Sequence, residues 1–163
     1  MYRVLLVDDW DIFLVELKRL NVWGAVSEFE VAGKASNGKQ ALEMLKSSPY
    51  DMVLTDIRMP VIDGLQLLRR INQDSLCSCV VLLSEYSEFN YARQGIVLGA
   101  FDYLVKPPSR DSLLELFRRA HCFLGALHLF QTAGLKAYEV GYQLAAPIPG
   151  KSDFPPFPQI FHR

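Results

Sequence analysis

Two short segments of the chain are apolar at every position rather than at alternate positions, namely Val4-Leu5-Leu6-Val7 and Val80-Val81-Leu82-Leu83. A strand with one face in water alternates apolar and polar side chains, whereas a strand buried on both faces does not. Sheets that are buried on both faces are almost always parallel and carry helices on each side. The feature therefore predicts an α/β fold with a parallel sheet at its centre.

Apolar runs of strand length alternate with segments of helical periodicity along most of the chain. We expect strands over 2–7, 29–35, 51–56, 79–84 and 101–105, and helices over 11–22, 38–47, 64–73, 88–98 and 110–128. Asn37-Gly38 and Asp63-Gly64 supply turn and capping residues before the second and third helices. Successive βα units of this kind predict a doubly wound, five-stranded parallel sheet with helices on both faces.

Length and charge exclude several classes of protein. With 163 residues, 50% of them hydrophobic, the chain can bury one good core. A net charge of -1 gives no field that would attract nucleic acid or an anionic membrane. Asp8 and Asp9 interrupt the N-terminal apolar run before it reaches signal-peptide length, and no run reaches the roughly 20 apolar residues that span a bilayer. We therefore expect a soluble, cytoplasmic protein that contacts neither nucleic acid nor membrane itself.

The C-terminal part of the chain differs from the rest in composition. The segments 146–150 and 154–158 are too rich in proline for a helix or for the interior of a sheet. We therefore expect one domain over 1–128 and an irregular, proline-rich tail or linker over 129–163. The phenylalanines of this tail offer anchors for a docked arm, whereas its composition favours a disordered end.

Acidic side chains end two of the predicted strands. Asp8 and Asp9 follow the first apolar run, and Asp56 ends the run over 51–56. Because the carboxyl ends of parallel strands converge at the crevice where open α/β sheets bind ligands, we expect these carboxylates to lie close together. Like charges held a few ångströms apart resist joint ionisation unless a cation accompanies them. The arrangement is typical of phosphate chemistry.

Further motifs stand at the ends of predicted strands or in the loops that follow them. In chain order they are Val7-Asp8-Asp9, Asp56-Ile57-Arg58-Met59-Pro60 with Asp63-Gly64, Leu83-Ser84, and Gly99-Ala100-Phe101-Asp102-Tyr103-Leu104-Val105-Lys106-Pro107. At this spacing the set resembles the receiver domain of two-component response regulators, over about residues 1–125. The resemblance implies the flavodoxin-like strand order 2-1-3-4-5. It also implies a phosphoacceptor that takes a phosphoryl group from a histidine kinase onto Asp56 and switches conformation to control an output.

The resemblance assigns roles to the acidic residues. Asp56 is the nucleophile that forms an aspartyl phosphate. Asp8, Asp9 and Asp56, with the backbone carbonyl of Arg58, would hold Mg²⁺ or Mn²⁺, Asp9 directly and Asp8 through water. Helix N-capping is an alternative role for one of the paired aspartates.

Three further residues take roles by the same resemblance. Lys106 would supply a positive charge to a phosphoryl oxygen, and a cis peptide bond between Lys106 and Pro107 would aim it inward. Ser84 would donate its hydroxyl to the phosphoryl group, and Tyr103 would move toward the space that this hydroxyl vacates. Ser84 and Tyr103 would then form the conformational switch.

Partners and output follow from the resemblance as well. The chain would catalyse its own phosphorylation and dephosphorylation rather than act as an ordinary enzyme. Its partners would be a sensor histidine kinase and a second copy bound through the fourth helix, fifth strand and fifth helix. The segments Ser84–Ala92 and Gly99–Tyr103 look most like regulators in which an AraC-type DNA-binding domain follows the receiver. Residues 129–163 are too few for such a domain, so the chain is either a fragment or a stand-alone receiver.

Two other functions remain as alternatives. Asp9-Trp10-Asp11 fits the D-x-D motif of a metal-dependent phosphatase with Asp9 as the nucleophile. That function would leave Asp56 without a role, and the sequence lacks a downstream acidic pair for the metal. A receiver-shaped interaction module that is never phosphorylated is the second alternative, and the complete set of chemical residues counts against it.

Overall fold

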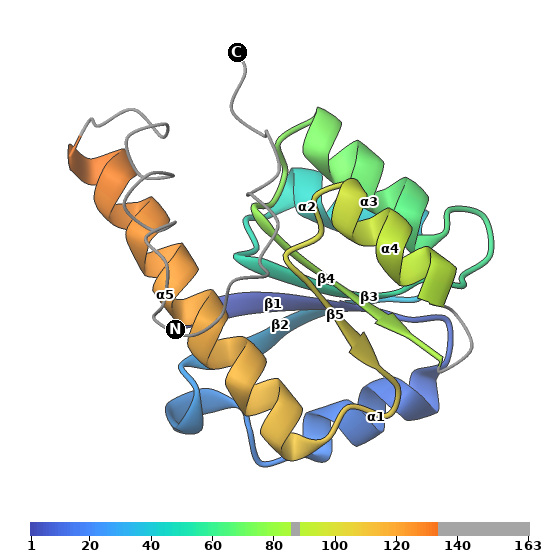
Figure 1. The fold of residues 1–163 in the computed structure, drawn as a ribbon, viewed down its shortest axis with the longest axis horizontal. Coiled ribbons are helices and arrows are strands. Elements are labelled where there is room, and N and C mark those ends of the chain that lie inside the picture. Colours follow the sequence, from blue (N-terminus) through green and yellow to red (C-terminus); the bar gives the residue numbers. More distant parts are fainter. Residues whose placement is uncertain (86–88, 134–163) are drawn as a thin grey trace.

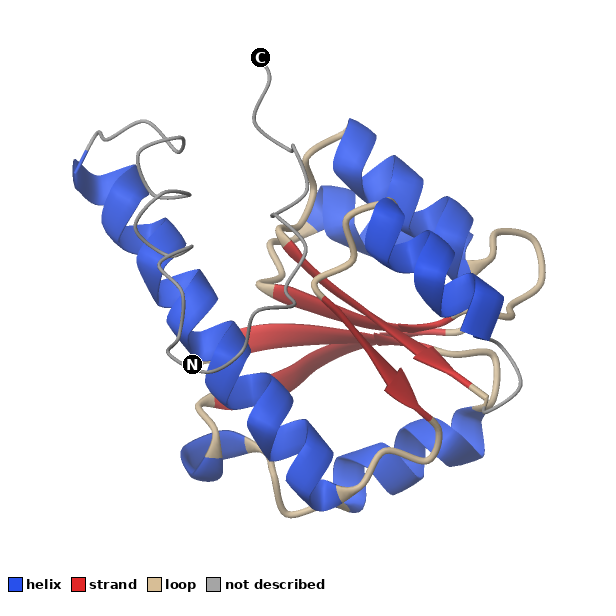
Figure 2. Cartoon of the chain, in the orientation of Figure 1, coloured by secondary structure: helices blue, strands red, loops and turns tan. Residues whose placement is uncertain are grey.

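The computed structural model describes residues 1–85 and 89–133, and their strands and helices alternate along the chain (Figures 1 and 2). In chain order the elements are β1 (Tyr2–Val7), α1 (Asp11–Arg19), the 3-10 helix η1 (Gly24–Val26), β2 (Phe29–Ala35), α2 (Gly38–Ser47), β3 (Met52–Asp56), α3 (Gly64–Gln73), β4 (Cys79–Ser84), α4 (Phe89–Val97), β5 (Asp102–Val105) and α5 (Arg110–Ala133). In this part of the chain no helix is both long enough and apolar enough to cross a membrane.

The strands form one parallel sheet in the order β2-β1-β3-β4-β5. Helices α1 and α5 cover one face of this sheet, and α2, α3 and α4 cover the other (Figure 1). The predicted doubly wound fold with its strand order 2-1-3-4-5 is confirmed.

Strand β1 shows why the sequence is apolar at consecutive positions. Val4 and Leu6 pack into the core beneath α1 and α5, whereas Leu5 and Val7 pack into the core beneath α2 and α3. All four side chains are fully buried. Since adjacent side chains on a strand point to opposite faces, a strand between two layers of helices needs an apolar residue at each position.

Helix α1 ends at Arg19, whereas the sequence predicted a helix as far as residue 22. Leu20 takes an extended conformation, and the chain then turns so that Val22 becomes fully buried in the core. The indole N–H of Trp23 donates a hydrogen bond of 2.8 Å to the carbonyl of Leu17 near the helix end. Burial of Val22 is thus incompatible with a continued helix, a tertiary effect that local periodicity does not reveal.

Helix α5 continues to Ala133, beyond the predicted end at residue 128. Residues 129–133 contain neither glycine nor proline, and the hydroxyl of Thr132 donates to the carbonyl of His128 at 2.9 Å within this last stretch. Residues 129–133 of the predicted irregular segment are therefore helical, and its remainder, residues 134–163, lies outside the described residues.

The turn from β3 into α3 depends on a glycine. Asp63 caps α3 by accepting a hydrogen bond from the backbone of Gln66, whose side chain accepts in return from the backbone of Asp63. A Cβ atom on Gly64 would collide with the carbonyl oxygen of Asp56 and would lie 2.9 Å from the Cα atom of Ile57. Both contacts are with backbone, so only glycine allows α3 to begin directly against the end of β3.

We expect Gly64→Ala to lower the free energy of unfolding by about 1–3 kcal/mol, because the added methyl group must displace backbone. Gly125→Ala is the matched control, since its Cβ would meet only the hydroxyl of Tyr2 at 3.7 Å. Inside a helix this exchange should stabilise the protein by about 0.5–1 kcal/mol. Urea denaturation measures both effects, and equal stability of the two variants would contradict the close approach at Gly64.

Candidate functional site

The three acidic residues singled out in the sequence lie together at one edge of the sheet. β1 and β3 are parallel neighbours, so Asp8, directly after β1, comes beside Asp56 at the end of β3. One carboxylate oxygen from each of Asp8, Asp9 and Asp56 lies within 4.8 Å of the others. Asp8 is 1% and Asp56 8% exposed, whereas Asp9 is exposed to solvent. We call this cluster the acid pocket.

Lys106, directly after β5, reaches into the acid pocket. Its Nζ atom lies 2.5 Å from Oδ2 of Asp8 and 2.9 Å from Oδ1 of Asp56. The Lys106–Pro107 peptide bond is cis, and Nζ also lies 4.4 Å from the centre of the Phe13 ring on α1. The ammonium group is thus a positive partner for the two buried carboxylates, and both hydrogen bonds are charge-assisted.

Burial and charge set the protonation of this site. Burial raises the pKa of Asp56 from 3.8 to about 6, and the charge of Asp8 adds to the rise, while Lys106 opposes it. Burial by itself would lower the pKa of Lys106, but its hydrogen bonds to Asp8 and Asp56 and their charges raise that pKa above 10.5. At neutral pH the site therefore offers an ionised carboxylate on Asp56 beside a fixed ammonium group.

Ser84 and Tyr103, the predicted switch residues, contact each other directly. The Ser84 Oγ and Tyr103 Oη atoms are 2.7 Å apart, and Ser84 is fully buried. Because the Ser84 hydroxyl donates its single proton to the carbonyl of Glu85 at 3.0 Å, the Tyr103 hydroxyl must donate to Ser84. The tyrosine already lies against the serine, and the predicted movement of Tyr103 toward a vacated space stays a prediction.

A hollow of about 420 Å³ adjoins the acid pocket. Its lining comprises Asp9, Ile57, Arg58, Met59, Pro60, Asp63, Leu65 and Tyr91. The guanidinium carbon of Arg58 lies 5.8 Å from the centre of the Tyr91 ring on α4. The sequence singled out Arg58 only for its backbone carbonyl, and it did not single out Tyr91 or Phe13. Their positions depend on contacts between distant elements that no local pattern reveals.

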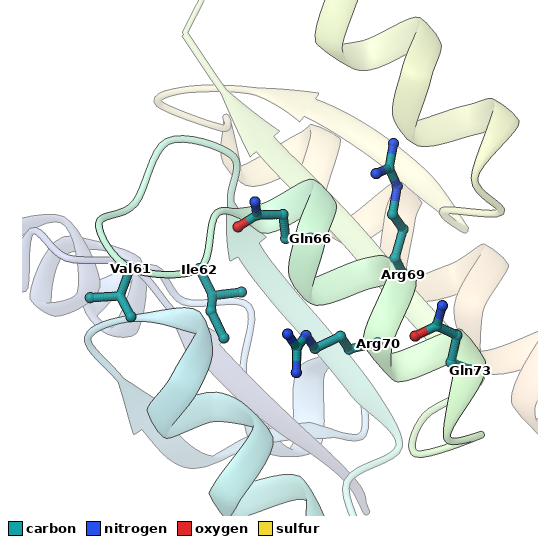
Figure 3. A pocket seen from close by; sticks show the side chains of 6 residues that line it. All are labelled: Val61, Ile62, Gln66, Arg69, Arg70 and Gln73. Carbon is teal, nitrogen blue, oxygen red and sulfur yellow. The ribbon is translucent and has the colours of Figure 1, made fainter.

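A second hollow, of about 310 Å³, lies on α3 and on the loop before it (Figure 3). Its lining comprises Val61, Ile62, Gln66, Arg69, Arg70 and Gln73. This lining offers no carboxylate as nucleophile or metal ligand, and Gln66 already belongs to the cap of α3. This hollow therefore lacks the carboxylates that the acid pocket offers.

The donors of the acid pocket suit a hard divalent cation. Three carboxylates that can each direct an oxygen to one point are ligands that Mg²⁺ and Mn²⁺ prefer. The exposed position of Asp9 leaves one carboxylate open to an ion from solvent, while Lys106 contacts the other two. The residues present therefore fit the expected metal.

With this geometry established, comparison with known proteins identifies the class. The family model of the response regulator receiver domain matches residues 4–118. This chain belongs to the response regulator receiver family, whose members are phosphoacceptors in two-component signalling and take their phosphoryl group from sensor histidine kinases.

Individual relatives support the same family assignment. Chemotaxis protein CheY of Bacillus subtilis is 33% identical over 118 residues, which cover 72% of this chain and 96% of that protein. Transcriptional regulatory protein HptR of Staphylococcus aureus is 37% identical over 120 residues, covering 73% of this chain and 46% of HptR. The chain thus spans less than half of this regulator.

Among solved structures, the receiver domain of AraT, a response regulator from Geobacillus stearothermophilus, superposes with a TM-score of 0.68 at 29% identity. The match covers 80% of this chain and 98% of that domain. The finer prediction of closeness to AraC-type regulators is not confirmed by these similarities and stays a prediction.

The raised pKa of Asp56 makes the stability of the metal-free protein depend on pH. The folded state binds this proton more tightly than the unfolded state does, so stability present at about pH 4 is lost as the pH rises past about 6. Asp56→Asn removes this pH dependence. The free energy of unfolding of Asp56→Asn relative to that of wild type should therefore rise by about 2–3 kcal/mol as the pH increases from about 4 to above 6. Urea denaturation in EDTA measures the difference. Asp111→Asn, at an exposed carboxyl group, is the control, and parallel pH profiles of wild type and Asp56→Asn would contradict the assignment.

Proposed function

We propose that Asp56 is the residue that accepts the phosphoryl group from the phosphohistidine of a sensor kinase. A carboxylate oxygen of Asp56 attacks phosphorus, the phosphorus–nitrogen bond breaks, and its electron pair leaves with the imidazole, which takes up a proton. The observation that carries this proposal is the contact of Lys106 with Asp56, because it sets a permanent positive charge where the phosphoryl oxygens would arrive. Lys106 contacts Asp56 and Asp8, which favours Asp56 over Asp9 as the nucleophile.

Each neighbour of Asp56 has a distinct part in this proposal. Lys106 would exchange one carboxylate partner for a phosphoryl oxygen and neutralise part of the added charge. Ser84 would donate its hydroxyl to another phosphoryl oxygen, which requires its present hydrogen bond to the Glu85 carbonyl to break. Tyr103 would follow because it now donates to that same hydroxyl.

The cation would be Mg²⁺ or Mn²⁺, held by Asp9 and Asp56 directly, by the backbone carbonyl of Arg58, and by Asp8 through water. A bound cation of this kind neutralises charge on the phosphoryl oxygens and so lowers the barrier to attack by an anion. The support for this ligand set is the cluster of carboxylates and the exposed position of Asp9.

The output follows from a shift in conformation. The phosphoryl group adds about two negative charges and three acceptor oxygens, and it favours the conformer that brings Ser84 and Lys106 closest to it. We propose that the surface of α4, β5 and α5 then changes and pairs with a second copy of the chain, without contacting nucleic acid itself. Since the chain spans only part of HptR, control of transcription would require a further domain.

Acetyl phosphate with Mg²⁺ should add the mass of one phosphoryl group to the wild-type chain, as measured by intact-mass spectrometry. Asp56→Asn should gain none, because the amide is not a nucleophile of comparable strength. Asp111→Asn is the control, since this exposed carboxyl group on α5 lies outside the acid pocket and outside the adjoining hollow. Phosphorylation of Asp56→Asn to the wild-type level would place the acceptor elsewhere.

Mg²⁺ alone should stabilise the wild-type protein, because a ligand that binds only the folded state shifts the unfolding equilibrium. At a concentration a hundredfold above its dissociation constant, the gain is about 2.7 kcal/mol. Asp9→Asn should lose most of this gain and still fold, since Asp9 is exposed. Denaturation with Mg²⁺ and with EDTA compares the two proteins, and an undiminished gain in Asp9→Asn would exclude Asp9 as a ligand.

A further inference from the structure

The hollow of about 310 Å³ on α3 has a lining that suits an anionic ligand (Figure 3). Two arginines and two glutamines come from α3, and two aliphatic residues come from the loop before it; they are Arg69, Arg70, Gln66, Gln73, Val61 and Ile62. The lining thus combines cationic groups, amides and aliphatic groups, and it contains no acid. A carboxylate or phosphate group in this hollow would therefore meet no like charge from its walls.

The two arginines of the hollow have no acidic partner of their own. Neither Arg69 nor Arg70 forms an ion pair or a hydrogen bond with any residue that the structure describes. The nearest acids along the chain are already engaged, since Asp74 pairs with Lys46 of α2 at 3.5 Å. Asp63 accepts a backbone hydrogen bond of 2.7 Å as the cap of α3. The described residues therefore leave both positive charges for an external anion.

Figure 3 shows how the donors of the hollow are arranged. The side chains of Gln66 and Arg70 extend from α3 toward Ile62 of the loop, whereas Arg69 points away from Arg70. Gln66 uses its amide oxygen to accept from the backbone of Asp63 at 3.2 Å, so its N–H groups are the donors that it can offer to an anion. Arg70 is thus the principal candidate to bind a carboxylate between helix and loop, through the planar fork of its guanidinium group.

Val61 gives the hollow an aliphatic rim at a cost to the fold. Its side chain is 78% exposed, and its φ of 72° lies in the left-handed region that β-branched residues rarely adopt. The backbone N–H of Ile62 donates to the carbonyl of Pro60 at 2.9 Å, which closes a γ-turn with Val61 at its centre. An exposed valine in a strained turn adds little to the core, whereas beside a hollow it can cover an aliphatic part of a ligand.

We propose that this hollow binds an acidic segment of a partner protein. A carboxylate side chain of the segment pairs with Arg70, and an aliphatic side chain next to it packs against Val61 and Ile62. The aliphatic rim favours a peptide over a free oxyanion. None of the lining residues is aromatic, which disfavours nucleic acid, since its bases stack on aromatic rings. The site does not use Asp56, so this inference and the proposed function can fail separately.

The probe is a capped peptide, Gly-Glu-Leu-Glu-Leu-Gly, added to the full isotope-labelled chain. NMR should show shifts of the amides of Val61–Gln73 and of the Arg70 Nε–H group. We expect a dissociation constant of about 0.1–1 mM at low salt, since the contacts are few and exposed. Replacing both glutamates of the peptide by glutamine should abolish binding, because the charges that pair with Arg70 are lost. Replacing both leucines by alanine should weaken binding about two- to fivefold.

Variants of the protein separate the hollow from a general effect of charge. Arg70→Ala should weaken binding of the peptide about three- to tenfold, and Arg69→Ala should weaken it less, since Arg69 points away from Arg70. Arg70→Lys keeps the charge but loses the planar fork, so it should recover only part of the affinity. Arg93→Ala is the matched control and should bind as wild type does, since Arg93 is an exposed arginine of α4 outside the lining.

Val61→Gly gives a readout that distinguishes binding from a structural role. Glycine adopts a positive φ without strain, so the midpoint of urea denaturation should stay the same or rise. Binding of the peptide should nevertheless weaken about two- to fivefold, because the aliphatic rim is lost. A residue that served only the fold would instead lower the midpoint when it is replaced.

Several results would overturn the inference. They are the absence of shifts with about 10 mM peptide, equal effects of Arg70→Ala and Arg93→Ala, and undiminished binding of the glutamine peptide. Tighter binding of inorganic phosphate or of a thymidine oligonucleotide than of the peptide would also overturn it. Asp56→Asn should bind the peptide as wild type does, so none of these results bears on the proposed acceptor.

Discussion

The contact of one ammonium group with two buried carboxylates is the interaction on which the rest of the site depends. Asp8 and Asp56 end neighbouring strands, and burying both as anions without a counter-charge would be costly. Lys106, which directly follows β5, supplies that positive charge. Because two acids hold Lys106, the proposed exchange of one of them for a phosphoryl oxygen would leave the ammonium group anchored by the other.

The fold makes this contact by aligning three strand ends. In a parallel sheet all carboxyl ends lie at one edge. Here β3 ends at Asp56, and β1 and β5 end directly before Asp8 and Lys106. Gly64 adds a local requirement, since α3 begins against the backbone of Asp56 itself. The core contributes indirectly. Apolar residues on both faces of β1 hold Asp8 at a fixed depth, and Phe13 of α1 lies beneath the ammonium group.

The sequence predicted the features that follow from local patterns. It did not predict the features that depend on contacts between segments far apart in the chain. Consecutive apolar residues gave the strands, and acids at strand ends gave the acid pocket, because both follow from the geometry of a parallel sheet. The predicted end of α1 at residue 22 was wrong, because burial of Val22 overrides helical periodicity. The contact of Arg58 with Tyr91 could not be predicted, since its two residues belong to separate elements whose relative position only the folded chain defines.

The surface that would respond to phosphorylation includes residues that are poorly buried. Ile96 and Val97 of α4 are 51% and 77% exposed, and every residue of β5 is at least partly exposed, whereas β3 and β4 are buried throughout. Gly95 lets α4 lie close against Leu82 but lowers the intrinsic stability of the helix. Elements with few buried contacts change conformation at lower free-energy cost than those of the core. In the proposed function, a change at the Ser84–Tyr103 pair would therefore shift β5 at a lower free-energy cost than it would shift the buried strands that hold the acid pocket.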